Sequence, residues 1–357
     1  MTGKQLTKGI VASLAIGAAL FLGSCGNNNE KAPDVSGIKV SLQTKRFDKD
    51  IYALDTAHIA DGLVKLKQQY PDFMDFYLDT VMGFGIRGNY VDTARAIRES
   101  VHEYITYKDY VHLQDTINHY YPDTKAVDEK LTGAYTYMKH YFPAFPVPKV
   151  IYANHILMNI PAVFCVDSNL TVVCLDMFLG SQFPYYASVG VPAYMAPHLT
   201  KDYIPVAVFR TTFEALYPYD PAEQPLVELM IHYGKEQYFL HKLMPATPDS
   251  VLFGFTGKQI KWCEQNEASI YNYFVQNNLL YNKRDAEVRP YVVDGPFARN
   301  LGTAAEPGTT PGNVGTWIGY RIVSAYMANN DKITLKELLD QKVEGTKFLE
   351  LAKYRPK

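Results

Sequence analysis

The sequence predicts an α+β protein that is predominantly helical and contains a small, mostly antiparallel sheet. Long segments on both sides of the centre carry apolar residues at three- and four-residue steps, which is typical of helices packed on a core. Between them lie short runs rich in β-branched and aromatic residues, which favour strands. Pro143, Pro146 and Pro148 separate the two patterns.

The part of the chain before these prolines is predicted to be helical. Residues Ile38–Leu42 alternate between apolar and polar, which indicates one half-buried strand. Helical spacing then covers residues 55–70, 73–82, 94–107, 110–121 and 126–142.

The part after the prolines is predicted to combine the sheet with further helices. The expected strands are Val150–Tyr152, Ala162–Val166 and Thr171–Leu175. The expected helices are Tyr203–Leu216, Leu226–Met244, Gly257–Asn277, Gly315–Met327 and Leu335–Leu339, and residues 184–197 and 295–312 are expected to be loops. A chain of 357 residues with 47% apolar and 20% charged residues can bury a large core. We therefore expect one α+β body over residues 38–357, helical at 38–142 and with sheet plus helices at 143–357.

The N-terminus has the features of an export signal. Lys4 and Lys8 precede the apolar run Ile10–Leu22, which is too short for a membrane span. The run ends in Leu-Gly-Ser-Cys, which resembles the lipobox of bacterial lipoproteins. We interpret residues 1–24 as a signal peptide, Cys25 as the acylated residue, and residues 25–37 as a polar tether. Acyl chains on Cys25 would attach the protein to a membrane.

Charge and cysteine content narrow the possible functions further. The formal net charge is −2 and no basic stripe is present, so we expect no nucleic-acid partner. Three cysteines follow Cys25: Cys165, Cys174 and Cys263. A hairpin could place Cys165 opposite Cys174, but a disulfide there would be strained, and three buried thiols are favoured.

The long helix Leu226–Met244 carries one polar stripe. Glu228, His232 and Glu236 follow one another at four-residue steps and share a face. Such a set can hold a divalent metal or form ordinary ion pairs, and Lys235 competes for either carboxylate. We favour the structural interpretation and expect no metal and no cofactor.

Known catalytic and nucleotide-binding motifs are absent or incomplete. His102-Glu103 lacks the second imidazole of a zinc-protease helix. The glycine-rich residues 83–88 follow a predicted helix instead of a strand, which argues against a nucleotide.

The C-terminal half resembles the GldB family of gliding-motility lipoproteins from bacteroidete bacteria. The resemblance rests on Leu175–Gly180, on Tyr233 and Gly234 with the residues after them, and above all on Pro311–Val323. The candidate interaction or family-motif residues are Tyr233, Gly234, Trp317, Gly319, Tyr320 and Arg321. The resemblance implies a cell-envelope lipoprotein required for gliding, whose machinery is tied to protein secretion across the outer membrane. It further implies a position in the outer membrane facing the periplasm, and partners among the other envelope proteins of that apparatus.

This family is also distantly similar to zincin-type peptidases. In those enzymes an HExxH helix precedes a second helix bearing Glu-Gly, and a Gly-Tyr helix follows. Here Tyr203–Leu216 takes the place of the first helix without a histidine, and Tyr233-Gly234 takes the place of Glu-Gly. The resemblance therefore implies a zincin-like, metal-free fold and a non-catalytic structural or interaction protein. Two alternatives stay open: a zinc peptidase with an unusual ligand set, and a peptide- or glycan-binding surface lipoprotein with a tyrosine-rich loop.

Overall fold

The computed structural model describes residues 32–85, 90, 95–158, 160–301 and 309–357. Residues 32–357 form one compact unit. The proposed signal peptide, Cys25 and part of the glycine-rich motif lie outside the described residues. Among the helices that are described, each is too short or too polar to cross a bilayer.

The helices before the proline cluster follow the predicted pattern. They are α1 (Phe47–Tyr52), α2 (Ile59–Gln69), α3 (Met74–Phe76) with the π-helix η1 (Tyr77–Val81), α4 (Arg95–Thr106), α5 (Lys108–Tyr120) and α6 (Lys125–Tyr141). The short helix α1 was not predicted. The predicted strand Ile38–Leu42 is wrong: its side chains do alternate in burial, but the segment has no ladder partner, and β1 (Thr44–Arg46) begins after it.

The sheet has four described strands in the order β1-β2-β4-β3. Strands β2 (Lys149–Ala153), β3 (Val163–Asp167) and β4 (Leu170–Cys174) confirm the three predicted strands. The expectation of a mostly antiparallel sheet is corrected, because β1–β2 and β2–β4 are parallel and only β3–β4 is antiparallel. The physical reason is burial: every residue of β4 is buried, so both faces of the sheet are covered, as is usual for parallel pairing.

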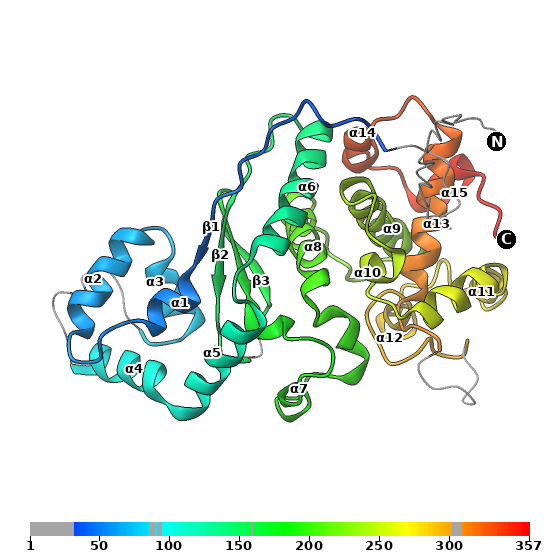
Figure 1. The fold of residues 1–357 in the computed structure, drawn as a ribbon. Coiled ribbons are helices and arrows are strands. Elements are labelled where there is room, and N and C mark those ends of the chain that lie inside the picture. Colours follow the sequence, from blue (N-terminus) through cyan, green and yellow to red (C-terminus); the bar gives the residue numbers. More distant parts are fainter. Residues whose placement is uncertain (1–31, 86–89, 91–94, 159, 302–308) are drawn as a thin grey trace, which may run out of the picture. The chain divides into compact units, whose positions relative to one another are not determined.

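The two faces of the sheet belong to two hydrophobic cores. Ile151 and Val172 point into a core formed with α1, α2 and α4, whereas Val150, Tyr152 and Val173 point into the larger core with α6, α8 and α9. Figure 1 shows these two groups of helices on either side of the strands. The α+β class, predominantly helical with a small sheet, is confirmed.

The remaining helices build the larger core. They are η2 (Leu175–Phe178), α7 (Tyr185–Ser188), η3 (Ala193–His198), η4 (Lys201–Tyr203), α8 (Ile204–Leu216), α9 (Leu226–Leu243), α10 (Asp249–Phe253), α11 (Gly257–Gln276), α12 (Asp285–Val288), η5 (Arg289–Tyr291), α13 (Val314–Asn329), α14 (Leu335–Asp340) and α15 (Gly345–Ala352). All five predicted helices are present. The predicted loop 184–197 instead contains two short helical turns, and α15 was not predicted.

Candidate functional site

A cleft of about 760 Å³ lies beside strand β3, at the edge of the described sheet. Residues 160–165, which lead into β3 and form its first half, line it together with helix α8. Its polar lining consists of His198, Tyr203, Arg210, Thr211, Glu214 and Asp294, and most of the remaining lining is apolar.

Helix α8 positions the charged side chains of this cleft. Pro205 lies in the first turn, where its missing N–H costs nothing and its fixed φ favours the helix. Val208 and Phe213 face the core, while Arg210 and Glu214, four residues apart, share the face that lines the cleft. The sequence thus combines an apolar face that anchors the helix with a polar face that the cleft exposes.

Arg210, in the lining of the cleft, forms an ion pair with Glu236 on the neighbouring helix α9. Its Nε lies 3.2 Å from Oε1 of Glu236 on α9, and the two side chains are 20% and 6% exposed. The Nε and Nη2 atoms of Arg210 nevertheless have no aligned hydrogen-bond partner among the described residues. Burial raises the pKa of Glu236 to about 7, and Arg210 opposes this rise.

His198 and Asp294 extend this polar group. The imidazole stacks on the Tyr203 ring with centroids 4.5 Å apart, and its Nδ1 lies 3.7 Å from Oδ2 of Asp294. Burial lowers the pKa of His198, while Asp294 favours its charged form. Gly254, at φ +67°, lies against this ring, where a Cβ would come within 1.7 Å of Nε2. Only glycine leaves room for the histidine.

The predicted stripe on α9 does not converge on one point. Glu228 accepts a hydrogen bond from the backbone N–H of Gly345, at the start of α15. The His232 ring stacks on Tyr219 at 4.0 Å, and burial lowers its pKa to about 4. Glu236 pairs with Arg210 in the cleft. The three side chains share a helix face but have different neighbours.

Tyr233 and Gly234 lie next to each other on α9, and Gly234 contacts helix α13. Burial raises the pKa of the Tyr233 hydroxyl, and the charges acting on it are Glu236, Arg289 and Glu214. Gly234 packs on Gly319: a Cβ on Gly234 would lie 2.3 Å from the backbone carbon of Gly319. These two glycines let α9 and α13 touch through their backbones.

The other predicted motif residues are packed inside the C-terminal half. The ring of Trp317 packs at a tilt against Phe253 with centroids 4.9 Å apart, and Tyr320 stacks on His241 at 4.2 Å. The Nε of Arg321 donates to Glu267 at 3.0 Å. These contacts give the motif Pro311–Val323 a role in packing α13 against its neighbours.

Sequence reasoning missed Arg210, Asp294 and a buried group formed by His155, Cys174 and Asp176. Arg210 and Asp294 gave no motif signal, because the fold alone brings α8, α9 and the segment after η5 together. Asp176 lies in Leu175–Gly180, a stretch that carries the family resemblance, but no spacing rule connects it with His155.

All three described cysteines are free thiols, so no disulfide joins Cys165 and Cys174.

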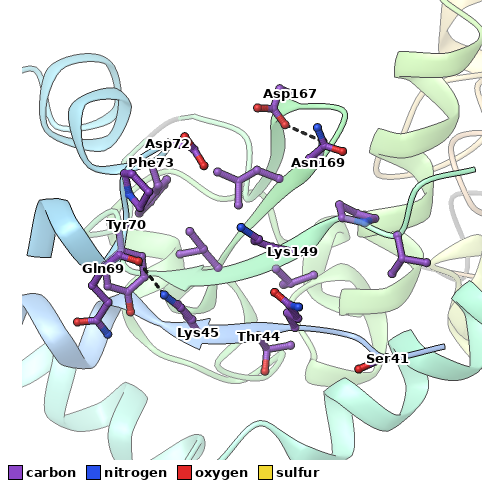
Figure 2. A pocket seen from close by; sticks show the side chains of 17 residues that line it. Ser41, Thr44, Lys45, Gln69, Tyr70, Asp72, Phe73, Lys149, Asp167 and Asn169 are labelled. Atoms are coloured by element: carbon purple, nitrogen blue, oxygen red, sulfur yellow. Dashed lines mark hydrogen bonds between the residues drawn. The ribbon is translucent and has the colours of Figure 1, made fainter.

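A second cleft, of about 940 Å³, lies at the amino ends of β1, β2 and β4. Figure 2 shows Lys45 in this cleft, donating to the backbone carbonyl of Gln69 at 2.7 Å. Lys149 and Asp72 also line it. None of the unpartnered buried polar atoms found in the described residues belongs to this lining. We therefore place the candidate site at the β3 and α8 cleft.

The fold and this cleft define a class: an α+β protein with a mixed sheet between two helical cores and a charged cleft at its edge strand. A family model described as gliding motility protein GldB matches residues 28–356, so the chain belongs to this family of gliding-associated lipoproteins. Searches of curated proteins and of solved structures found no match.

Proposed function

We propose that this protein is a non-catalytic, lipid-anchored component of the gliding machinery that holds an extended peptide segment of another envelope protein. The open edge of β3 is the observation that supports this most directly. Among the described strands β3 pairs with β4 alone, and the cleft runs along the same residues. An extended segment can add main-chain hydrogen bonds to such an edge while its side chains enter the neighbouring cleft.

The charges of the cleft favour a segment with a basic side chain. Arg210 is already paired with Glu236, whereas Glu214 and Asp294 add two more carboxylates to the lining. The balance of the cleft is therefore acidic. A lysine or arginine of the bound segment would be attracted to Glu214 and Asp294, an effect that added salt weakens.

The composition of the cleft favours holding over cutting. A guanidinium stays protonated at all physiological pH values, so Arg210 cannot ligate a metal. Metal-assisted hydrolysis needs a cation that activates water. The rival peptidase would need His232 and Glu236 to share an ion, yet they contact Tyr219 and Arg210 respectively. The similarity to zincin-type peptidases stays a prediction.

Anchorage through Cys25, with residues 25–37 as a tether, completes the proposal. It is supported by the lipobox and by the family match. The proposed location is the outer membrane facing the periplasm, among proteins of the gliding and secretion apparatus.

The tyrosine-rich loop gives the glycan-binding alternative limited support. Tyr185 and Tyr194 are 54% and 36% exposed, whereas Tyr186 and Tyr203 are buried. A sugar platform needs exposed rings next to one another, and half of these rings face the core.

The role in gliding is tested by gene deletion and a cleft-filling variant. We expect a clean deletion strain to lose gliding, wild-type protein to restore it, and Thr211→Trp to restore membrane-bound protein but not movement. Gly133→Ala, at an exposed helical site with open space around it, serves as the control and should restore gliding. A deletion strain that glides normally, or full rescue by a stable Thr211→Trp protein, would contradict the proposal.

The charge preference is tested with two synthetic peptides. Both have the same β-favouring sequence and differ only in a central lysine or glutamate. We expect the lysine peptide to bind several-fold more tightly at low salt, and Thr211→Trp to abolish its binding. Equal binding of the two peptides would remove the role given to Glu214 and Asp294.

A further inference from the structure

The carboxyl ends of β2 and β4 bring three chemically different metal donors together. The two strands are parallel neighbours, with Ala153 opposite Cys174 in the register. The residues that follow them, His155 and Asp176, therefore leave the sheet at the same edge, where parallel sheets usually place their ligands. A histidine nitrogen, the cysteine sulfur and a carboxylate oxygen all lie within 4.8 Å of one another.

The imidazole of His155 lacks a satisfied hydrogen bond in this group. It is fully buried, and neither ring nitrogen has an aligned partner among the described residues. Its Nδ1 lies 2.6 Å from Oδ2 of Asp176, close enough for a strong interaction but without hydrogen-bond alignment. Buried polar atoms normally have partners, so a ring whose Nε2 has none, at a cluster of donors, points to a missing partner.

The backbone holds this group in place at the cost of local strain. Ile156 and Leu157 both have positive φ, +52° and +56°, a region that L-residues rarely adopt. Asn154 accepts the N–H of Ile156 at 2.9 Å, and Asp176 accepts the N–H groups of Leu157 at 2.7 Å and His155 at 3.2 Å. The carboxylate that would bind a metal is thus oriented by two backbone N–H groups, as metal ligands usually are.

We propose that His155, Cys174 and Asp176 form a buried structural site for a divalent, thiophilic cation, of which Zn²⁺ is the best match. One nitrogen, one sulfur and one oxygen are the donors that Zn²⁺ accepts in tetrahedral sites. Three protein donors leave the fourth tetrahedral position to a water. A cation would require the His155 and Asp176 donors to separate slightly, through rotation of the imidazole.

The Cys174 thiol would couple metal binding to the release of a proton. A free buried thiol carries its proton, whereas a metal-bound cysteine is a thiolate. On binding, the metal–sulfur bond replaces the S–H bond, and one proton is released to solvent with no change in oxidation state. Because all three residues are fully buried, the ion would join the ends of β2 and β4 to η2 instead of meeting a substrate.

The experiment measures metal in full-length protein purified in detergent without chelators. We expect about one zinc per chain, a lower thermal midpoint after chelation, and recovery with Zn²⁺ alone. Reloading with Co²⁺ should give a thiolate-to-cobalt charge-transfer band in the near ultraviolet. Cys174→Ser should remove this band and weaken zinc binding at least about tenfold.

Two controls separate this site from the alternatives. Cys263→Ser, at another buried thiol, should keep the metal and the cobalt band. His232→Ala should also keep them, whereas a peptidase centre on α9 would lose its metal in this variant. Chains that take up no Zn²⁺ after reloading, or a cobalt band that survives Cys174→Ser, would overturn the proposal. Neither result bears on the peptide cleft.

Discussion

Glu236 is an acid buried next to a permanent cation, and its titration makes stability depend on pH. Burial raises its pKa to about 7 from an ordinary value of 4.5, with Arg210 opposing the rise. Because the pKa of Glu236 is raised in the folded state, its contribution to the free energy of unfolding is fully present below pH 4.5 and is lost as pH rises through about 7. We expect the wild type to lose on the order of 2–3 kcal/mol of unfolding free energy across this window, and Glu236→Gln to remove that loss.

Urea denaturation at about pH 5 and about pH 8 measures this effect. Glu264, on the exposed face of α11, provides a matched control, because Glu264→Gln should leave the pH profile unchanged. If the unfolding free energy of Glu236→Gln changes with pH as much as that of the wild type, Glu236 is not the source of the pH dependence.

His232 is predicted to make the fold sensitive to acid. Burial lowers its pKa to about 4, and Lys235 adds to this shift, while the ring stacks on Tyr219. Because the pKa of His232 is lowered in the folded state, its contribution to stability is present above pH 6.5, the pKa in the unfolded chain. It is lost as pH falls toward 4. His232→Phe keeps an aromatic ring that cannot be protonated. Its thermal midpoint should fall less than that of the wild type on acidification, and an equal fall would exclude His232.

At the scale of elements, the crossing of α9 and α13 depends on glycine. A Cβ on Gly319 would lie 1.8 Å from the carbonyl oxygen of Met230, so the two helices would have to separate. Overpacking of this kind costs about 1–3 kcal/mol and occasionally more. We expect Gly319→Ala to destabilise the protein by about 3 kcal/mol or more in urea denaturation.

Gly133 on α6 is the internal control for this prediction. Nothing lies within 4 Å of the position that its Cβ would occupy. Gly133→Ala should be neutral or stabilising by up to about 1 kcal/mol, because alanine favours a helix. Equal effects of the two substitutions would show that the helix crossing tolerates a methyl group.

Strand direction is one element-scale feature that the sequence pattern did not predict correctly. The hydrophobic runs of β2, β3 and β4 were recognisable, but a run of apolar residues carries no information about its neighbour. Strand β2 lies beside β4 and not beside β3, the next strand in the chain. Parallel pairing is usual where helices cover both faces of a sheet, and that covering exists only in the packed structure.

At the scale of the whole molecule, the folded unit is proposed to depend on Cys25 for its location. Acyl chains on Cys25 would supply the attachment, since each buried methylene favours the membrane by about 0.8 kcal/mol. We expect Cys25→Ala to abolish incorporation of a fatty-acid label, to move the protein out of the membrane fraction and to stop gliding. Retention of the variant in the membrane fraction would contradict this prediction. Gly133→Ala should fractionate like the wild type.

The sequence by itself determined the helical periodicity, the positions of the three central strands, the lipobox and the family resemblance. These features are local, because spacing along the chain sets which side of a helix or strand is apolar. The tertiary structure decided which charged residues meet. Arg210 reaches Glu236, and His155 reaches Asp176, only because α8 packs on α9 and β2 lies beside β4. Such contacts join residues far apart in sequence, and the packing that brings them together has no counterpart in local spacing.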